Sequence, residues 1–144
     1  MYDISTVRTL VVDDSAPWRD FIIAWLHEAR VQAIDSASDG SEAVQKAQQA
    51  PPDLILMDIS LPKLSGLEAA RQILACAPTC TILFVSNNEN LETIRAAFRI
   101  GGRGYVLKSS VHGDLREGIE VVLQGRRFVG RGLSGDTLAD PGEL

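Results

Sequence analysis

Short apolar runs and amphipathic helical segments alternate five times along the chain, and this alternation limits the possible folds more than any other feature. Each run is rich in Val, Ile or Leu, and apolar side chains recur at helical spacing after it. The expected strands are 7–12, 31–37, 54–57, 81–85 and 104–107, and the expected helices are 17–30, 41–50, 66–77, 90–100 and 111–123. The alternation favours an α/β fold with a doubly wound, five-stranded parallel sheet and five helices, because parallel neighbours need crossover connections.

Polar residues stand where four of the five expected strands end. Asp13 and Asp14 follow the first strand, Asp58 follows the third, Ser86 follows the fourth and Lys108 follows the fifth. In an open parallel sheet the ligand site forms beyond the carboxyl ends of the strands. The sequence therefore predicts that three carboxylates, a hydroxyl and an ammonium lie together at one edge of the sheet.

These side chains suit phosphoryl transfer. Clustered carboxylates repel one another unless a cation lies between them, and their hard oxygen ligands suit Mg²⁺. A carboxylate beside Mg²⁺ can attack a phosphoryl group, while a lysine and a hydroxyl stabilise the transferred oxygens. Asp58, which ends the buried run LILM, is the expected acceptor. Any one of these residues alone is better explained as a helix cap or loop residue, so the prediction depends on the whole set.

Length and charge limit the setting in which such a site works. A chain of 144 residues suffices for one domain, and its net charge of -5 argues against a nucleic-acid-binding surface. No apolar run approaches the roughly 18 residues that span a bilayer, and the N-terminus lacks signal-peptide features. We therefore expect a cytoplasmic protein without membrane contact.

Three residues separate Cys76 from Cys80, a spacing that predicts free thiols rather than a redox or zinc site.

Four segments together resemble the receiver domains of two-component response regulators. They are VVDDS at 11–15, MDISLPKLSG at 57–66, FVSN at 84–87 and GYVLKSS at 104–110. The resemblance covers about residues 7–125, and its last segment is most similar to receivers of the LuxR/NarL-type subgroup, a group of transcription regulators. It implies a flavodoxin-like receiver with strand order 2-1-3-4-5.

The resemblance also implies a role for each residue of the site. Asp58 would accept a phosphoryl group from a sensor histidine kinase, with Ser86 and Lys108 beside the reacting group. The protein would then be a signalling receiver and not an enzyme, apart from assisting its own phosphorylation and dephosphorylation. The ligands of Mg²⁺ would be Asp13, Asp14, Asp58 and the backbone carbonyl of Ser60.

A conformational switch is implied as well. Ser86 would move toward the phosphoryl group, and Tyr105 would then turn from an exposed to an inward rotamer. This movement would reshape the surface formed by the fourth helix, the fifth strand and the fifth helix. We expect that surface to mediate homodimerisation or the docking of a partner.

Two positions depart from the pattern of the family. Ser109 follows Lys108 where the family usually has a proline after a cis bond, and a non-proline cis bond costs about 2.5–4 kcal/mol. A trans Lys108–Ser109 bond is therefore expected. Asn87 stands where a small residue is usual and would narrow access to the acceptor.

Two other functions remain open. A Mg²⁺-dependent phosphatase of the haloacid dehalogenase type also uses an aspartate after a strand, but its pattern has a second aspartate where Ser60 stands. Asn87 favours the other alternative, a receiver-like interaction module that does not depend on phosphorylation. In domain terms we expect a receiver over 5–125, followed by a flexible C-terminal tail or linker start over 126–144 that is too short for a DNA-binding helix pair.

Overall fold

The computed structural model describes residues 2–133, and all strands within these residues form one parallel sheet. The strand order is β2-β1-β3-β4-β5-β6. The strands are β1 (Thr9–Val12), β2 (Ile34–Ala37), β3 (Leu54–Met57), β4 (Thr81–Ser86), β5 (Gly104–Leu107) and β6 (Phe128–Val129). The predicted α/β fold and the order 2-1-3-4-5 are confirmed, with a short sixth strand added at the β5 edge.

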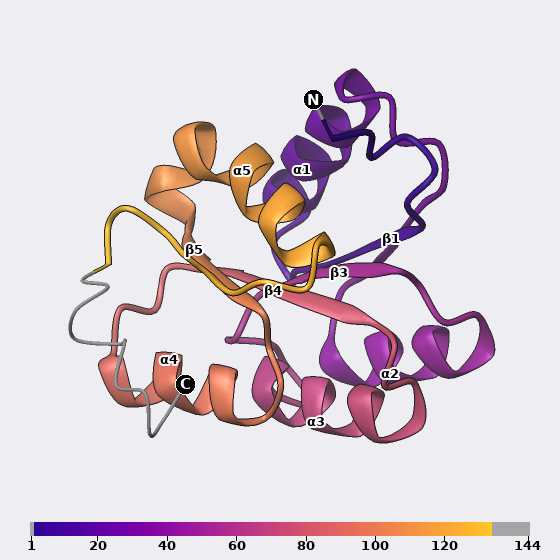
Figure 1. Ribbon diagram of the computed structural model, residues 1–144. Helices are drawn as coiled ribbons and strands as arrows, with labels where there is room; N and C mark the ends of the chain where they lie inside the picture. The colour runs from indigo at the N-terminus through magenta and orange to yellow at the C-terminus, as the bar shows by residue number, and fades with distance from the viewer. Residues whose placement is uncertain (1, 134–144) are drawn as a thin grey trace.

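Helices cover both faces of the sheet (Figure 1). One face carries α1 (Ala16–Glu28) and α5 (Val111–Leu123). The other carries α2 (Gly40–Gln49), α3 (Gly66–Cys76) and α4 (Leu91–Arg99). None of the helices within residues 2–133 is both long enough and apolar enough to cross a bilayer.

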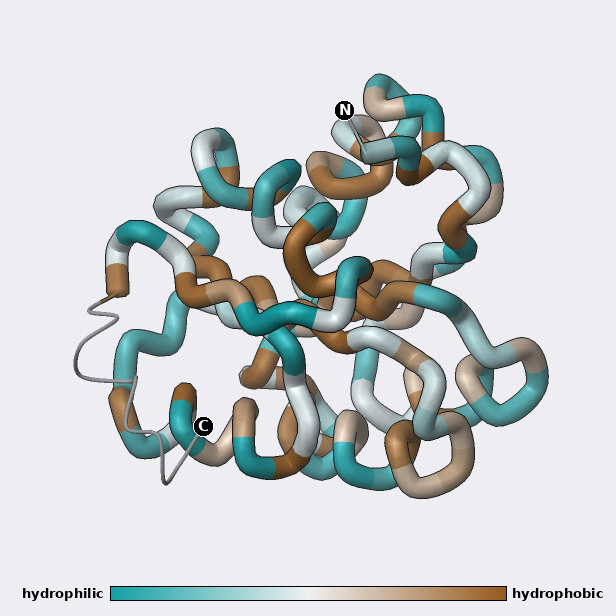
Figure 2. Tube along the Cα trace, viewed as in Figure 1, coloured by the Kyte–Doolittle hydropathy of each residue, from teal (hydrophilic) through white to brown (hydrophobic). Residues whose placement is uncertain are grey.

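The buried sheet divides the hydrophobic core into two clusters, one under each layer of helices. In β3, Leu54 and Leu56 face α1 and α5, whereas Ile55 and Met57 face the other helices, and all four are at most 2% exposed. Both faces of this strand are dry, which explains why its sequence is apolar without alternation. Figure 2 shows the same layering, with hydrophobic residues along the central strands.

Four of the helices begin at a side-chain cap near the carboxyl end of a strand. In each case a side-chain oxygen accepts a hydrogen bond from the backbone N–H three residues later, and the four capping residues are Ser15, Asp39, Ser65 and Asn90. Such caps stabilise a helix by about 1 kcal/mol each. They also determine which side chains of the first turn lie beside the carboxyl edge of the sheet.

The segment after Gly125 differs from the sequence-based expectation of a flexible tail. Phe128 and Val129 pair with Gly104 and Tyr105 of β5, and Phe128 is only 9% exposed. This pairing occupies backbone groups of β5 that would otherwise be left at an open sheet edge. Phe128 and Val129 therefore belong to the sheet, whereas residues 134–144 lie outside the described residues.

Candidate functional site

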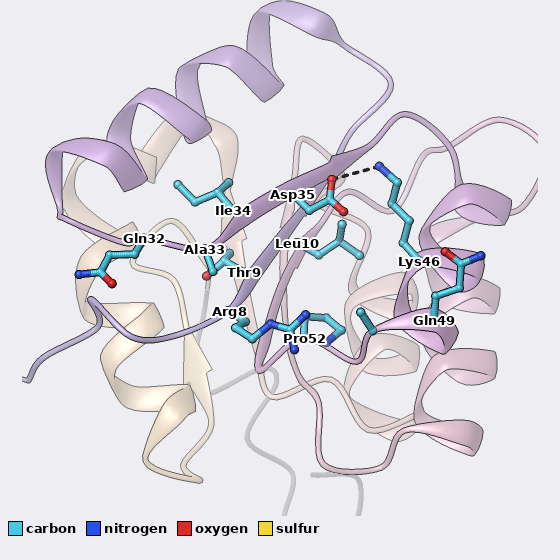
Figure 3. A pocket seen from close by; sticks show the side chains of 11 residues that line it. Arg8, Thr9, Leu10, Gln32, Ala33, Ile34, Asp35, Lys46, Gln49 and Pro52 are labelled. Carbon is cyan, nitrogen blue, oxygen red and sulfur yellow. Dashed lines mark hydrogen bonds and ion pairs between the residues drawn. The ribbon is translucent and has the colours of Figure 1, made fainter.

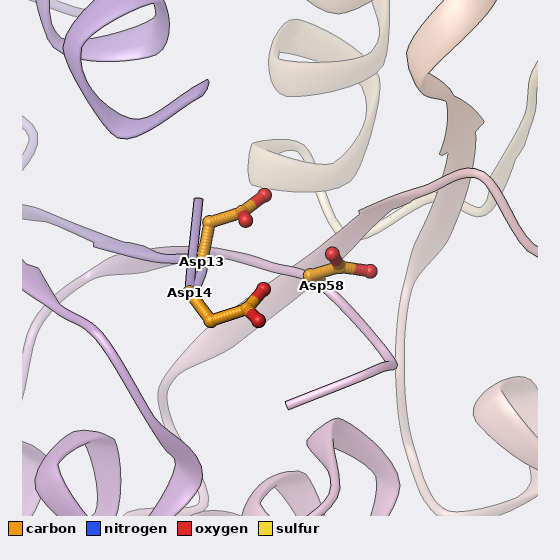
Figure 4. A group of neighbouring side chains, drawn as sticks. All are labelled: Asp13, Asp14 and Asp58. Carbon is orange, nitrogen blue, oxygen red and sulfur yellow. The ribbon is translucent and has the colours of Figure 1, made fainter. Parts of the chain in front are cut away.

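Three carboxylates meet at the carboxyl edge of the sheet (Figure 4). Val12 pairs with Met57 in the register of β1 and β3, so the next residues, Asp13 and Asp58, emerge side by side. Both are buried, whereas Asp14 is exposed. One carboxylate oxygen from each of the three aspartates lies within 4.8 Å of the others. The strand ends thus bring together the acidic residues that the sequence predicts.

Lys108 lies between the two buried carboxylates. Its Nζ atom is 2.8 Å from Oδ2 of Asp13 and 3.0 Å from Oδ2 of Asp58, and the residue is 7% exposed. Burial lowers the pKa of Lys108, but its hydrogen bonds to both carboxylates raise that pKa by more, so the ammonium form is retained. Burial, together with repulsion from Asp58, raises the pKa of Asp13 against the opposing effect of Lys108.

Backbone N–H groups fix the other oxygen of each buried carboxylate. Oδ1 of Asp58 accepts from the N–H of Ile59 at 2.7 Å and from that of Ser60 at 3.4 Å. Oδ1 of Asp13 accepts from the N–H of Ser15 at 2.9 Å. Both carboxylates are therefore held in one orientation by their own loops.

Gly66 allows α3 to start directly against the acceptor loop. Its N–H donates to the carbonyl of Ile59 at 2.8 Å, and a Cβ at this position would lie 2.0 Å from the backbone oxygen of Asp58. Real Cβ atoms do not come so close to a backbone oxygen. The close approach requires glycine and fixes the position of Asp58 relative to α3.

A pocket of about 330 Å³ opens beside Asp58. Its other lining residues are Ser60, Ser86, Asn87 and Asn88. Ser86 is 1% exposed, and its Oγ accepts the N–H of Asn88 at 3.2 Å, whereas Asn87 is exposed. The pocket therefore places a carboxylate and a hydroxyl around one small polar space.

Tyr105 lies fully inside the protein, which corrects the expectation that it starts from an exposed rotamer. Its hydroxyl donates to the backbone carbonyl of Asn88 at 2.7 Å, and its ring packs against Phe84 with centroids 6.2 Å apart. The sequence gives no sign of this acceptor, because it belongs to the loop between β4 and α4. Burial raises the pKa of Tyr105 to about 12, although a hydrogen bond with Ser86 acts in the opposite direction.

Two residues of α1 that the sequence analysis left out of the site also contact it. Nη1 of Arg19 donates to the backbone carbonyl of Asp13 at 2.6 Å. The ring of Trp18, whose N–H is capped by Ser15, lies with its centroid 5.1 Å from Nζ of Lys108. The Ser15 cap could have indicated this position from sequence, because a helix separated from a strand by only three residues carries its first turn over the end of the strand.

The donor set fits a divalent cation. Three carboxylates and one ammonium leave two negative charges at the site, and carboxylate oxygens are the ligands that Mg²⁺ prefers. Ser60 lines the same pocket as Asp58. Ser109 follows Lys108 through a trans bond, as expected, since residues 2–133 contain no cis peptide bond.

A second groove, of about 470 Å³, lies at the opposite ends of the strands (Figure 3). It runs over the starts of β1 and β2 and the end of α2, and its lining includes Lys46 and Asp35, which form an ion pair at 3.1 Å. This groove contains none of the residues that the sequence predicts for the site.

Comparison with known proteins identifies related chains. The profile of the response regulator receiver domain matches residues 9–120. The response regulator GacA of Pseudomonas viridiflava is 31% identical over 124 residues, which are 85% of this chain and 58% of that protein. The transcriptional regulatory protein DegU of Brevibacillus brevis is 29% identical over 124 residues, which are 85% of this chain and 52% of that protein. The chain therefore spans about half the length of these curated relatives.

Among solved structures, a LuxR-family two-component response regulator from Aurantimonas sp. SI85-9A1 is similar over nearly the whole chain. The TM-score is 0.83 at 30% sequence identity, and the match covers 96% of this chain and 99% of that one. The response regulator domain of CheB from Thermotoga maritima has a TM-score of 0.76 at 31% identity, with coverage of 83% and 97%.

Proposed function

Since the chain belongs to the family of response regulator receiver domains, we propose that it is a signalling switch in which Asp58 accepts a phosphoryl group from a sensor histidine kinase. One observation carries the proposal: the buried carboxylate of Asp58 is bonded to Lys108 and also lines the 330 Å³ pocket. A phosphoryl group on Asp58 would occupy that pocket, within reach of the hydroxyl of Ser86.

In the proposed transfer a carboxylate oxygen of Asp58 attacks the phosphorus of a phosphohistidine. The new O–P bond forms as the P–N bond breaks, and the imidazole nitrogen keeps the electron pair. Lys108 lies 3.0 Å from Asp58 Oδ2, so its ammonium can follow the negative charge as it moves from the carboxylate to the phosphoryl oxygens. Ser86 can donate its hydroxyl proton to one of these oxygens in a hydrogen bond.

The acidic residues would hold Mg²⁺ during this transfer. The proposed ligands are Asp13, Asp14, Asp58 and the backbone carbonyl of Ser60. When bound, Mg²⁺ would neutralise the carboxylates and the incoming phosphoryl oxygens, whose like charges otherwise repel each other. Two observations support this assignment: carboxylate oxygens of the three aspartates lie within 4.8 Å of one another, and the site has a net negative charge.

The proposed output begins at the loop between β4 and α4. The backbone carbonyl of Asn88 in this loop accepts a hydrogen bond from the hydroxyl of Tyr105, and the backbone N–H of Asn88 donates to Oγ of Ser86. A movement of Ser86 toward a phosphoryl group would therefore alter the contact that holds Tyr105 inward, rather than draw an exposed ring into the protein. The surface of α4, β5 and α5 would change in consequence, and β6, which pairs with β5, borders it.

We propose that this surface mediates homodimerisation or partner docking and that the output is transcriptional. The similarity to the transcriptional regulatory protein DegU supports that output. The net charge of -5 supports an action through protein contacts rather than direct nucleic-acid binding by these residues.

Treatment with acetyl phosphate, with and without Mg²⁺, tests the proposal. The expected result is a Mg²⁺-dependent increase in mass by one phosphoryl group, located on Asp58 and absent from Asp58→Asn. The exposed Asp20 of α1 provides a matched control, because Asp20→Asn removes an acidic residue outside the site.

The outcomes separate the alternative functions. A phosphatase would hydrolyse the donor over many turnovers without retaining the label, and an interaction module would neither hydrolyse the donor nor gain mass. Exposed Asn87, at the lining of the pocket, is the observation that favours the interaction module. Labelling that persists in Asp58→Asn would place the acceptor elsewhere.

A further inference from the structure

An aromatic ring covers the ammonium of Lys108 on the side toward α1. Nζ of Lys108 lies 5.1 Å from the centroid of Trp18, within the distance at which a cation is attracted to the face of an indole. The same ammonium is bonded to Asp13 and Asp58. Lys108 is thus held between two carboxylates and an aromatic ring.

The local fold fixes Trp18 in this position. Ser15 caps α1 by accepting the N–H of Trp18, and the N–H of Ser15 is itself bonded to Oδ1 of Asp13. The start of the helix is therefore tied to the acidic site. Phe21 packs edge-on against Trp18, with centroids 5.3 Å apart and planes at 89°, and it contacts His112 of α5 at 5.5 Å. The ring cannot move far without disturbing the contact between α1 and α5.

Burial alone does not explain why an indole stands here. Trp18 is only half-buried, and it borders an open groove of about 340 Å³ together with Phe21, Lys108 and His112. Core packing alone therefore does not account for a tryptophan that borders an open groove next to the ammonium of Lys108.

We propose that Trp18 is a positioning residue for Lys108, a role that deepens the proposed phosphoryl transfer and rests on it. The ring screens the ammonium from water and restrains it close to Asp58, where it can pair with the phosphoryl oxygens. The pairing of Lys108 with a phosphoryl group is then stronger, because its ammonium is already oriented and partly desolvated.

A double-mutant cycle tests the contact without using phosphorylation. Urea unfolding is measured for the wild type, Trp18→Leu, Lys108→Met and the double variant. Leucine keeps an apolar side chain but removes the π face. The changes in the free energy of unfolding are expected to be non-additive for Trp18→Leu and Lys108→Met. In a control cycle, Trp25→Leu replaces Trp18→Leu two turns further along α1, and the changes are expected to be additive. Additive effects for Trp18 and Lys108 would overturn the proposal.

Phosphorylation by acetyl phosphate in the presence of Mg²⁺, followed by intact mass, tests the consequence. The rate is expected to fall by roughly twofold to thirtyfold in Trp18→Leu, the range that corresponds to a cation–π contact. Trp18→Phe, which keeps an aromatic face, is expected to recover part of the rate, and Trp25→Leu is expected to retain the wild-type rate. A wild-type rate in Trp18→Leu, or no recovery in Trp18→Phe, would overturn the positioning role.

The reactivity of the three lysines separates positioning from general loosening of the fold. Labelling with acetic anhydride, read by peptide mass, is expected to rise at Lys108 in Trp18→Leu but to stay unchanged at Lys46 and Lys63. A rise at all three would indicate general destabilisation and contradict the proposal. Absence of phosphorylation in the wild type would overturn the proposed function and the positioning role together, while the double-mutant cycle would still report the contact.

Discussion

Lys108 neutralises only part of the charge that Asp13, Asp14 and Asp58 place at the carboxyl ends of β1 and β3. The two buried carboxylates share one ammonium, and Asp14 adds a further charge at the exposed side. Like charges at this separation oppose folding until a cation relieves them. The site therefore links metal binding to the stability of the native state.

Mg²⁺ is expected to stabilise the protein by mass action, by about 2.7 kcal/mol at a concentration one hundred times its dissociation constant. Asp14→Asn is expected to raise the stability of the metal-free protein, because it removes repulsion, and to lose most of the Mg²⁺ effect. Urea unfolding over a series of Mg²⁺ concentrations measures both quantities, with Asp20→Asn as the control. Equal Mg²⁺ dependence in Asp14→Asn and the wild type would exclude Asp14 as a ligand.

The buried phenol of Tyr105 predicts a loss of stability at high pH. Its pKa in the folded protein is about 12, above the ordinary tyrosine value of 10.0, so the native state binds this proton more tightly than the unfolded state does. The corresponding stability is fully present below pH 10 and is lost as the pH rises toward 12. Its size is up to about 3 kcal/mol for a shift of this order.

The difference in unfolding free energy between the wild type and Tyr105→Phe should therefore shrink as the pH rises from 10 to 12. Urea unfolding at several pH values measures it. In Tyr2→Phe, Tyr105 is the only tyrosine left, so tyrosinate absorbance reports its titration directly. A stability difference that does not vary over this pH range would show that burial does not raise the pKa of Tyr105.

At the scale of elements, the close contact between α3 and the acceptor loop predicts that one added methyl group, at Gly66, lowers the stability of the protein. In Gly66→Ala the new Cβ would meet the backbone oxygen of Asp58 at 2.0 Å, so the loop or the helix must shift. Overpacking of this kind costs about 1–3 kcal/mol or more, and the displaced Asp58 should also be phosphorylated more slowly.

Gly113→Ala is the matched control for this substitution. At Gly113 a Cβ would meet only the end of the flexible Arg131 side chain, at 3.4 Å, so helix propensity predicts a gain of about 0.5–1 kcal/mol. Urea unfolding of the two variants measures the contrast. Equal stability of both would contradict the role assigned to Gly66.

The elements differ in how far sequence alone predicts them. The strand ends that place Asp13, Asp58 and Lys108 were predictable, because short apolar runs end abruptly on charged residues. β6 was not, since two residues between Arg127 and Gly130 are too few to show a period and gain their order from pairing with β5. The inward ring of Tyr105 also depends on a partner outside its own element, the carbonyl of Asn88.

At the scale of the whole molecule, the segment around β6 closes the sheet edge and ties it to α5. Arg131 donates its backbone N–H to Oδ2 of Asp114 at 2.8 Å and its Nη1 to Oδ1 at 2.9 Å, and Asp114 is 1% exposed. Gly130 donates to the carbonyl of Tyr105 at 2.9 Å. We therefore propose that the folded unit extends beyond Gly125 and includes this segment.

Arg131→Ala tests the ion pair that holds the segment. The buried carboxylate of Asp114 would keep the backbone N–H but lose the guanidinium, at a cost of about 1–2 kcal/mol after allowance for the exposure of Arg131. Arg126→Ala, at an exposed position before β6, is expected to change stability little. Urea unfolding measures both variants, and equal stability would show that the ion pair with Asp114 contributes nothing.

Two truncations separate the contribution of β6 from that of the residues after it. A chain that ends at Gly125 loses the buried ring of Phe128 and exposes the backbone of β5, so it should lose at least about 3 kcal/mol of stability. The bare strand edge should also promote self-association. A chain that ends at Leu133 keeps β6 and Arg131, so it should retain this stability and should not gain the self-association of the bare strand edge. Urea unfolding measures the stability, and sedimentation measures the self-association. If the chain that ends at Gly125 stays monomeric and fully stable, β6 does not contribute to the fold, as the sequence-based expectation of a flexible tail implies.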